Sequence, residues 1–278
     1  LDQMVSIDAA SPIELMEWAI GARPSAIVCD IDGTIAPIAP TPAEARLAPG
    51  AREALIELTK LVDVVAAVTG RSCTDGAAMI GIPEMHVVGN HGLEWLRDGE
   101  REIDPAAVAA VPRIQAALTE IAVVVSHDPD LQGTYVEDKT LSGSIHYRQT
   151  MNHTVSFQKL YALARAAGER HGLKITEGRL VIELRPPVDI NKGAALLRII
   201  ARDQLRGMVF LGDDVTDVDG FRVLSNLRTE RNFAGASIAI SDPEAKPEVV
   251  AAADAFVPGV PACIDLLATF ARRRSNRG

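Results

Sequence analysis

Short apolar runs, each followed by polar residues, recur along the first hundred residues. Residues 25–30, 62–68 and 85–89 are nearly continuous apolar stretches. Such runs are typical of parallel strands that are buried on both faces. Between them, residues 51–61 place Ala and Leu at the spacing of an amphipathic helix, and a second helix is expected over about 72–80. The pattern predicts alternating strands and helices, and therefore a parallel sheet.

The middle of the chain has a different pattern. Two helical stretches and several short alternating segments follow one another, at about 104–120, 122–126, 134–137, 144–148, 155–171, 173–176 and 180–184. Alternation between turn signals predicts a small, mostly antiparallel sheet with two helices. Pro186 and Pro187 mark the return to the first pattern.

From Asn191 onward, helices and apolar strands alternate again. We expect them at 192–202, 208–211, 221–225, 236–240 and 261–274. The sequence therefore predicts an α/β fold with a core built on a parallel sheet. We expect residues 1–104 and 187–278 to form this core and residues 105–186 to form an inserted module.

Composition narrows the possible functions. Hydrophobic residues make up 47% of the chain and charged residues 23%, which is typical of a globular protein. The net charge of −9 argues against binding to nucleic acid or to anionic lipid, because both require a basic face. No run of 18 or more apolar residues is present, so no membrane span is expected.

Cysteine usage indicates a reducing compartment. Cys29, Cys73 and Cys263 are far apart, odd in number and without CxxC spacing. We therefore expect neither a disulfide framework nor a structural zinc site. Residues 1–12 carry acidic residues where a signal peptide would carry a basic segment. A cytoplasmic location is expected.

Polar side chains follow several of the predicted strands. They are Asp30, Asp32, Thr69, Asp213, Asp214 and Asp217. Ligands of open α/β sheets bind at the carboxyl ends of the strands, so these groups can converge on one cleft. Taken singly, an acidic turn, a threonine at a helix N-terminus or the isolated Lys192 fits an ordinary surface feature equally well.

The segment 212–219 holds four carboxylates within seven residues. Such crowding is costly unless a cation neutralises it or water screens it. An EF-hand calcium loop is excluded, because Val215 and Asn226 stand where Asp and Glu are needed. The glycine-rich loops for nucleotides and the GxSxG elbow of serine hydrolases are absent from the sequence.

Together these residues meet the needs of phosphoryl transfer through an aspartyl intermediate. Asp30 can attack phosphorus, and Asp32 can transfer protons. Two anions then meet, so a divalent cation and Lys192 are needed to offset their repulsion. All-oxygen ligands favour Mg²⁺ over zinc.

Four motifs carry a family resemblance. DIDGT (30–34), VTGR (68–71), Lys192 and GDDVTD (212–217) resemble, in order, the motifs of haloacid-dehalogenase-superfamily phosphatases. VGNHGLE (88–94), VEDKTLSGSIHYR (136–148) and GRLVIELRP (178–186) are similar to segments of the trehalose-6-phosphate phosphatase family. The resemblance implies a magnesium-dependent phosphoric monoester hydrolase of trehalose biosynthesis, acting on trehalose 6-phosphate. It also implies that the α/β core is Rossmann-like and that residues 105–186 are an inserted α+β cap domain that selects the substrate.

The resemblance also implies a role for each matching residue. Asp30 would be the nucleophile and a magnesium ligand, Asp32 the general acid/base and a ligand through its carbonyl, and Asp213 the third ligand. Asp214 and Asp217 would support the metal site, and Thr69 and Lys192 would hold the phosphoryl oxygens during catalysis. The implied substrate-binding residues are Thr69, Gly70, Arg71, Asn90, His91, Glu94, Glu137, Lys139, His146, Arg148, Arg179, Glu183 and Arg185.

Other functions remain open at this point. A related phosphatase acting on sucrose 6-phosphate or mannosyl-3-phosphoglycerate is the main alternative, and a phosphomutase shares Asp30 and Asp32. A dehalogenase is disfavoured because a halide leaving group has little use for Asp32. A sugar-phosphate-binding regulator would be expected to lack Asp30, Asp32 or Lys192, and all three are present. We expect a monomer whose partner is a small sugar phosphate.

Overall fold

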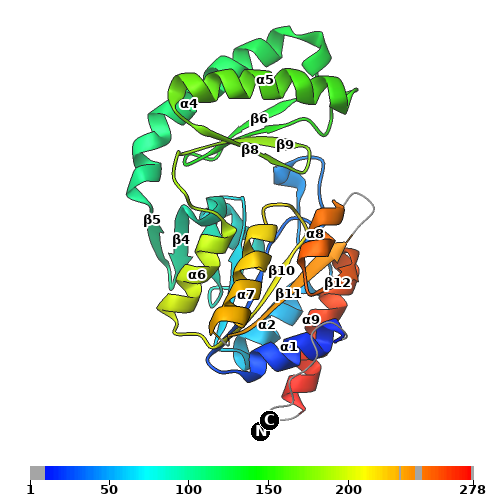
Figure 1. Ribbon diagram of the computed structural model, residues 1–278. Coiled ribbons are helices and arrows are strands. Elements are labelled where there is room, and N and C mark those ends of the chain that lie inside the picture. The colour runs from blue at the N-terminus through cyan, green and yellow to red at the C-terminus, as the bar shows by residue number, and fades with distance from the viewer. Residues whose placement is uncertain (1–9, 232, 242–245, 277–278) are drawn as a thin grey trace. The chain divides into compact units, whose positions relative to one another are not determined.

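The chain divides into two compact units. A computed structural model describes residues 10–231, 233–241 and 246–276. Unit 1 contains the described residues up to Arg101 and from Ile190 onward, and unit 2 is Glu102–Asp189 (Figure 1). The predicted insert of residues 105–186 therefore lies inside unit 2.

Within the described residues, unit 1 is built on an eight-stranded sheet of order β12-β11-β10-β1-β2-β3-β4-β5. The strands from β12 to β3 pair in parallel, and β4 runs antiparallel to β3. Their bounds are β1 Ser25–Cys29, β2 Val64–Val68, β3 His86–Gly89, β4 Glu94–Arg97, β5 Glu100–Ile103, β10 Gly207–Gly212, β11 Ala234–Ser241 and β12 Ala255–Pro258. The predicted α/β fold is confirmed.

Helices cover both faces of this sheet (Figure 1). Ile27 and Cys29 of β1 pack into one hydrophobic core, whereas Ala26 and Val28 pack into another. This alternation follows from the period of two along a strand. The first core is closed by α1 (Pro12–Gly21), α2 (Ala51–Leu61), α3 (Cys73–Ile80) and α9 (Gly259–Ser275), and the second by α6 (Lys192–Arg202), α7 (Val218–Arg231) and α8 (Pro247–Ala252).

The register of the central strands positions the site. Cys29, near the end of β1, pairs with Leu211 of β10 on one side and with Ala67 of β2 on the other. The three parallel strands therefore end at the same edge of the sheet, and the residues that follow them are neighbours.

Unit 2 packs two helices on an antiparallel sheet of order β6-β7-β9-β8. Its core combines Ala110 and Ile114 of the first helix with Leu160 of the second and Ile145 and Ile182 of the sheet. The elements are α4 (Pro105–His127), α5 (His153–His171), β6 (Tyr135–Asp138), β7 (Gly143–His146), β8 (Lys174–Gly178) and β9 (Val181–Arg185).

The expected strand at residues 122–126 is wrong, because this segment is the last part of α4. Its run of valines has strand propensity, but Asp104 caps the helix, which continues through Pro112 as far as His127. Helix α7 is longer than the predicted 221–225. Polar residues outnumber apolar ones in this helix, so the apolar spacing that indicates a helix is weak over most of its length.

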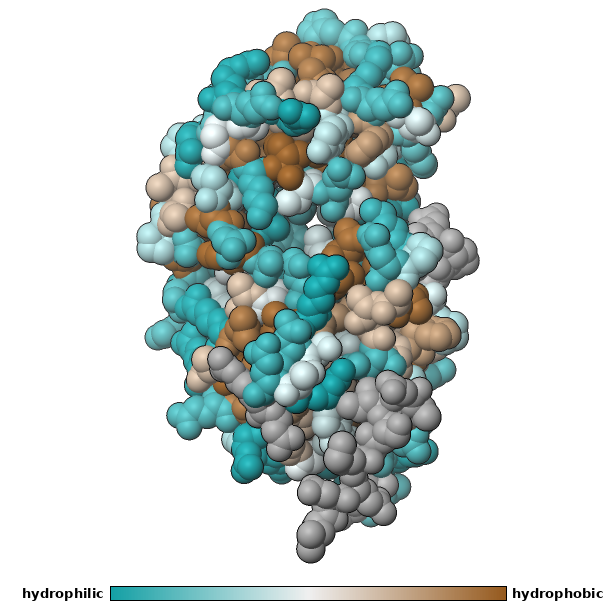
Figure 2. All heavy atoms as spheres, in the orientation of Figure 1, coloured by the Kyte–Doolittle hydropathy of each residue, from teal (hydrophilic) through white to brown (hydrophobic). Residues whose placement is uncertain are grey.

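Helix α4 is, among the described residues, long and apolar enough to cross a membrane, with a mean hydropathy of 1.6 over 18 residues. The search for an uninterrupted apolar run of 18 residues did not select this helix, because polar residues interrupt its apolar stretch. Core helices of soluble proteins meet the same criteria of length and composition. One side of α4 lies in the core of unit 2, and 28% of the stretch is buried. On the face shown in Figure 2, hydrophobic residues lie in separate groups among hydrophilic ones.

Candidate active site

A buried lysine joins two carboxylates at the edge where the parallel strands end. Asp30 directly follows β1, and Lys192 is the first residue of α6, whose N-terminus is capped by Asn191. The Lys192 Nζ lies 2.9 Å from Asp30 Oδ2 and 2.6 Å from Asp217 Oδ1. Only 2% of Lys192 is exposed. The lysine is therefore part of the site rather than a surface charge.

The loop after β10 is organised by Asp217. Its Oδ2 accepts hydrogen bonds from the backbone N–H groups of Asp213 and Asp214, both at 3.0 Å. The Thr34 hydroxyl donates to Asp213 Oδ1 at 3.0 Å. Gly33 has a φ of +89°, and a Cβ there would lie 1.9 Å from Asp213 Oδ2. Only glycine therefore lets the two acidic segments approach this closely.

The electrostatics of this cluster are those of crowded, buried anions. Burial raises the pKa of Asp30 to about 7, Lys192 opposes this shift, and the nearby Asp217 adds to it. Burial raises the pKa of Asp213, and the neighbouring carboxylates of Asp30 and Asp217 raise it further. Burial disfavours the charged form of Lys192, but Asp217 and Asp30 outweigh it and raise its pKa. The cluster is therefore short of positive charge.

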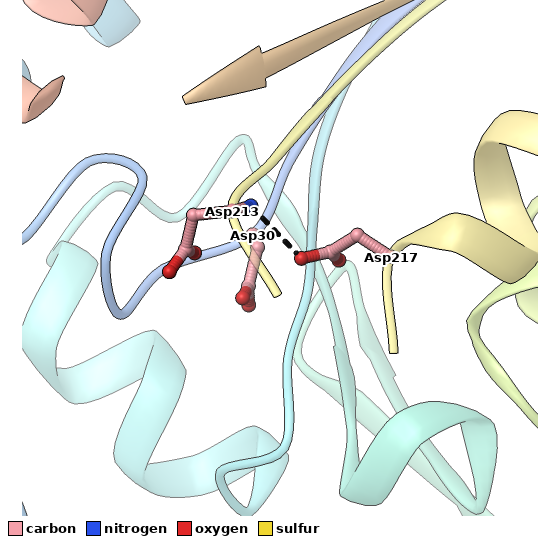
Figure 3. Close-up of side chains that lie close together, drawn as sticks. All are labelled: Asp30, Asp213 and Asp217. Carbon is pink, nitrogen blue, oxygen red and sulfur yellow. Dashed lines mark hydrogen bonds between the residues drawn. The ribbon is translucent and has the colours of Figure 1, made fainter. Parts of the chain in front are cut away.

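A magnesium ion fits these residues. Carboxylate oxygens of Asp30, Asp213 and Asp217 all lie within 4.8 Å of one another (Figure 3). Asp30 Oδ1 is buried and has no hydrogen-bond partner among the described residues. An all-oxygen donor set and an excess of negative charge suit a hard divalent cation.

The ends of β2 and β3 are joined by backbone hydrogen bonds. The His91 N–H donates to the Thr69 carbonyl at 2.9 Å, and the Asn90 N–H donates to the Arg71 carbonyl at 2.7 Å. A Cβ on Gly70 would lie 2.8 Å from His91 Nε2. Thr69 and His91 are both buried. These two predicted residues therefore lie side by side at the same sheet edge as Asp30.

Glu94, implied as a substrate-binding residue, is held by hydrogen bonds within unit 1. Its side chain is fully buried, and it accepts hydrogen bonds from the Cys73 N–H at 3.0 Å and from Asn90 Nδ2 at 2.6 Å. Arg101 forms an ion pair with it at 2.6 Å. Glu94 thus holds the loop that begins at Asn90, where the φ of 48° is left-handed. The carboxylate of Glu94 is therefore engaged by three neighbouring residues of unit 1.

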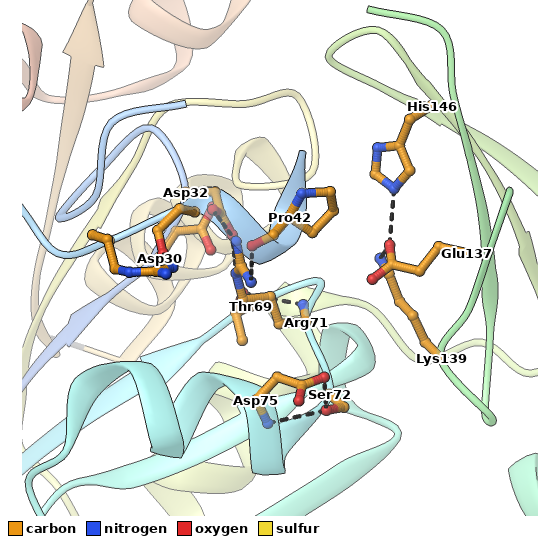
Figure 4. Close-up of polar contacts among 12 residues, drawn as sticks. Asp30, Asp32, Pro42, Thr69, Arg71, Ser72, Asp75, Glu137, Lys139 and His146 are labelled. Atoms are coloured by element: carbon orange, nitrogen blue, oxygen red, sulfur yellow. Dashed lines mark hydrogen bonds and ion pairs between the residues drawn. The ribbon is translucent and has the colours of Figure 1, made fainter. Parts of the chain in front are cut away.

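Arg71, implied as a substrate-binding residue, contacts Asp32 (Figure 4). Arg71 Nε donates to Asp32 Oδ2 at 2.6 Å, and a terminal nitrogen donates to Oδ1 at 2.7 Å. Another terminal nitrogen donates to the Pro42 carbonyl at 3.1 Å. The implied general acid/base is thus held by a guanidinium group.

Unit 2 gathers several of the remaining predicted residues on one face of its sheet. Glu137, Ser144 and Glu183 are register partners across β6, β7 and β9. The Lys139 Nζ lies 3.3 Å from Glu183 Oε1 and 3.9 Å from Glu137 Oε2, and His146 Nε2 lies 2.8 Å from Glu137 Oε2 (Figure 4). The apolar residues between them face the helices, so this row lies on the opposite, polar face.

The three predicted arginines of unit 2 lie at strand ends and turns. Arg185 ends β9 two residues after Glu183 and is therefore on the polar face. The Arg148 guanidinium donates to the Arg179 carbonyl at 3.4 Å, which links the residues after β7 to the turn between β8 and β9.

Sequence reasoning missed the supporting residues Thr34, Arg101 and Ser144. Thr34 lies within the quoted DIDGT motif, so the motif itself held the signal. Arg101 and Ser144 act through contacts with Glu94 and Glu183. Those contacts depend on strand register, which the sequence pattern leaves undetermined.

Comparison with known proteins identifies the family. The model of the trehalose-phosphatase family matches residues 28–248. This match covers most of unit 1, all of unit 2, and every predicted site residue. The chain belongs to the trehalose-phosphatase family. The trehalose-phosphate phosphatases of Mycobacterium tuberculosis and Mycobacterium leprae are each 36% identical to it, over 78% and 72% of this chain and 55% and 48% of their own lengths.

The chain thus spans about half the length of the trehalose-phosphatase family relatives that it matches. Solved structures share its fold at low identity. The C. albicans trehalose-6-phosphate phosphatase C-terminal domain is 20% identical with a TM-score of 0.79, covering 95% of this chain and 97% of that one. A haloacid dehalogenase-like hydrolase from Bacteroides thetaiotaomicron is 17% identical with a TM-score of 0.59, covering 90% and 98%.

Proposed function

We propose that this protein is a magnesium-dependent phosphatase that hydrolyses trehalose 6-phosphate to trehalose and phosphate through an aspartyl-phosphate intermediate. One observation carries the proposal. The buried Lys192 pairs with Asp30 Oδ2 at the sheet edge, while Asp30 Oδ1 is without a hydrogen-bond partner among the described residues. A carboxylate held in this way can attack an incoming phosphoryl group.

In the first step, an Asp30 oxygen attacks phosphorus, and the bond from phosphorus to the sugar oxygen breaks. That oxygen takes a proton from the Asp32 carboxyl group and leaves as an alcohol. Lys192 stabilises the negative charge that accumulates on the phosphoryl oxygens. The hydroxyl of Thr69, a buried residue that directly follows β2, would hold one of these oxygens.

In the second step, water attacks the phosphorus of the aspartyl phosphate. Asp32 accepts the proton of this water, the bond between phosphorus and Asp30 breaks, and inorganic phosphate is released. Asp32 is thereby protonated again, which prepares it for the next turnover.

Magnesium would be held by Asp30, by the Asp32 carbonyl and by Asp213, with Asp214 and Asp217 in support. The bound ion would offset the repulsion between the carboxylate and the phosphate dianion. Asp217 uses both of its oxygens on Lys192 and on the backbone N–H groups of its loop, which supports a positioning role for this residue.

Selection of the sugar is assigned to unit 2 in this proposal. The phosphoryl site needs only the phosphate and one ester oxygen, so it does not distinguish one sugar from another. The row of Glu137, Lys139, His146 and Glu183 offers charged donors and acceptors for sugar hydroxyls. The related mycobacterial proteins are named trehalose-phosphate phosphatases, which supports trehalose 6-phosphate as the substrate.

Trapping of the intermediate tests the mechanism. Wild-type protein quenched in acid during turnover with Mg²⁺ should carry one phosphoryl group on Asp30 by peptide mass spectrometry. Asp30→Asn should bind substrate but carry no phosphate and release none. Normal phosphate release by Asp30→Asn, or full activity of the wild type in EDTA, would contradict the proposal.

A further inference from the structure

The contact between Arg71 and Asp32 has the geometry of a strong, directional ion pair. Two nitrogens of one guanidinium group reach the two oxygens of one carboxylate, at 2.6 Å and 2.7 Å. A bidentate pair of this kind fixes the plane of the carboxylate as well as its distance. The side chains are 14% and 31% exposed, so water competes only weakly with the pair.

Arg71 is itself held at both ends. At its backbone, the carbonyl accepts from the Asn90 N–H at 2.7 Å, and its N–H donates to Thr69 Oγ1 at 3.2 Å. At its tip, the guanidinium donates to the Pro42 carbonyl at 3.1 Å. The backbone of Arg71 is therefore tied to the segment after β3, and its guanidinium to the segment at Pro42.

We propose that Arg71 is a positioning residue that fixes the Asp32 carboxyl group for proton transfer to the leaving oxygen, in place of binding the sugar. This inference rests on the proposed function, in which Asp32 protonates that oxygen. A general acid must lie within hydrogen-bond reach of its target, and a displacement of about 1 Å can cost about a hundredfold in rate.

The proposal separates substrates by their leaving groups. An alkoxide leaving from trehalose 6-phosphate or glucose 6-phosphate is strongly basic and needs a proton as its bond to phosphorus breaks. A dinitrophenolate leaving from 2,4-dinitrophenyl phosphate is weakly basic and needs none. Misplacement of Asp32 therefore slows phosphorylation of Asp30 by the first class of substrate and spares the second.

The test compares kcat/KM for both classes, because this ratio reports the steps up to formation of the aspartyl phosphate. Arg71→Ala should lower kcat/KM for trehalose 6-phosphate about a hundredfold and for 2,4-dinitrophenyl phosphate less than about threefold. Arg71→Lys keeps the charge but cannot form the bidentate contact with Asp32. It should therefore recover little of the kcat/KM for trehalose 6-phosphate. In the Asp32→Asn background, Arg71→Ala should have no further effect.

A matched control exists in the same unit. Arg23 forms the same bidentate arrangement with Asp63, at 3.0 Å and 2.6 Å, and takes no part in the site. Arg23→Ala should leave kcat/KM unchanged for both trehalose 6-phosphate and 2,4-dinitrophenyl phosphate. Thermal unfolding of each variant shows whether a loss reflects the fold.

Equal losses on alkyl and aryl phosphates would overturn the inference, because Arg71 would then act on the phosphoryl group itself. The inference would also be overturned if Arg71→Ala left kcat/KM for trehalose 6-phosphate unchanged or raised it. A further fall in kcat/KM when Arg71→Ala is added to Asp32→Asn would overturn it as well. Failure of the wild type to hydrolyse trehalose 6-phosphate is a separate outcome, which contradicts the proposed function before Arg71 is tested.

Discussion

At the scale of single residues, the site depends on a charge that is removed from water. Lys192 is buried between Asp30 and Asp217, and both contacts are shorter than 3 Å. Removing one partner of such a buried pair leaves uncompensated charge, which costs about 3–5 kcal/mol. One cation serves two carboxylates here, so the loss of Lys192 would leave both without a counter-charge.

We predict that Lys192→Met lowers both activity and stability. The loss of kcat/KM should be at least about a hundredfold, because the charge on the transferring phosphoryl group loses its fixed counter-charge. The free energy of unfolding should fall by about 3 kcal/mol, measured by urea denaturation.

Lys60→Met is the matched control for this variant. The Lys60 Nζ also lies 2.6 Å from a carboxylate, that of Glu57, but both side chains are more than half exposed. Its effect on stability should stay below about 1 kcal/mol, and activity should not change. Similar effects of the two substitutions would contradict a buried, functional pair at Lys192.

Glu94 gives a prediction that depends on pH. Burial alone would raise its pKa, but hydrogen bonds from Cys73 and Arg101 outweigh burial, and the net pKa is lowered from 4.5. Stability from a depressed pKa is present above the unfolded value and disappears as pH falls through the folded value. Glu94→Gln should therefore cost roughly 2–4 kcal/mol at pH 7.

The difference between wild type and Glu94→Gln should shrink as the pH falls below about 4.5. Denaturation at a series of pH values measures it, with the exposed Glu57→Gln as the control. A difference that stays constant down to pH 3 would show that the charge of Glu94 contributes nothing.

At the scale of elements, the sheet of unit 2 presents a row of charged residues opposite its helices. We predict that Lys139→Ala and Glu183→Gln lower kcat/KM for trehalose 6-phosphate by about tenfold or more and change that for p-nitrophenyl phosphate far less. The reason is that a site built to bind hydroxyls discriminates through hydrogen bonds that a simple aryl ester does not make.

Lys159→Ala provides the control in the same unit, because Lys159 pairs with Asp128 and Asp130 rather than with the polar row. Lys159→Ala should leave kcat/KM unchanged for both trehalose 6-phosphate and p-nitrophenyl phosphate. Equal losses on both substrates for Lys139→Ala would contradict recognition of the sugar by this face.

Strands β1, β2, β3, β10 and β11 of unit 1 could be predicted because burial on both faces gives continuous apolar runs. Strands β4, β5 and β12 were not expected, because they are partly exposed and lack such a run. The four motifs also placed Asp30, Thr69 and Asp213 at strand ends, where the structure has them. Residues 122–126 were misread because a run of valines suits a strand or a buried helix equally well. The contact of Arg71 with Asp32 joins residues 39 positions apart in the sequence. The contact of Glu94 with Arg101 depends on how β4 and β5 pair, which the sequence pattern leaves undetermined.

At the scale of the whole molecule, each unit has its own hydrophobic core. The net charge is −9, and three of the carboxylates are concentrated at one point in unit 1. A cation that binds there only in the folded state stabilises the protein by mass action.

We therefore predict that Mg²⁺ raises the thermal unfolding temperature. At a concentration of about one hundred times its Kd, it should add about 2.7 kcal/mol to the free energy of unfolding. Asp213→Asn should abolish this shift, whereas Asp219→Asn, which is near in sequence but outside the cluster, should retain it. If Mg²⁺ raised the unfolding temperature equally in both variants, the ion would not bind at Asp213.

The central claim is that a phosphatase site in unit 1 serves trehalose 6-phosphate. Its most direct test is kcat/KM for phosphate release from trehalose 6-phosphate, sucrose 6-phosphate, mannosyl-3-phosphoglycerate and glucose 6-phosphate, with saturating Mg²⁺. The account predicts that trehalose 6-phosphate is turned over fastest and that Asp30→Asn releases no phosphate from any of them. A higher kcat/KM for sucrose 6-phosphate or mannosyl-3-phosphoglycerate would contradict it.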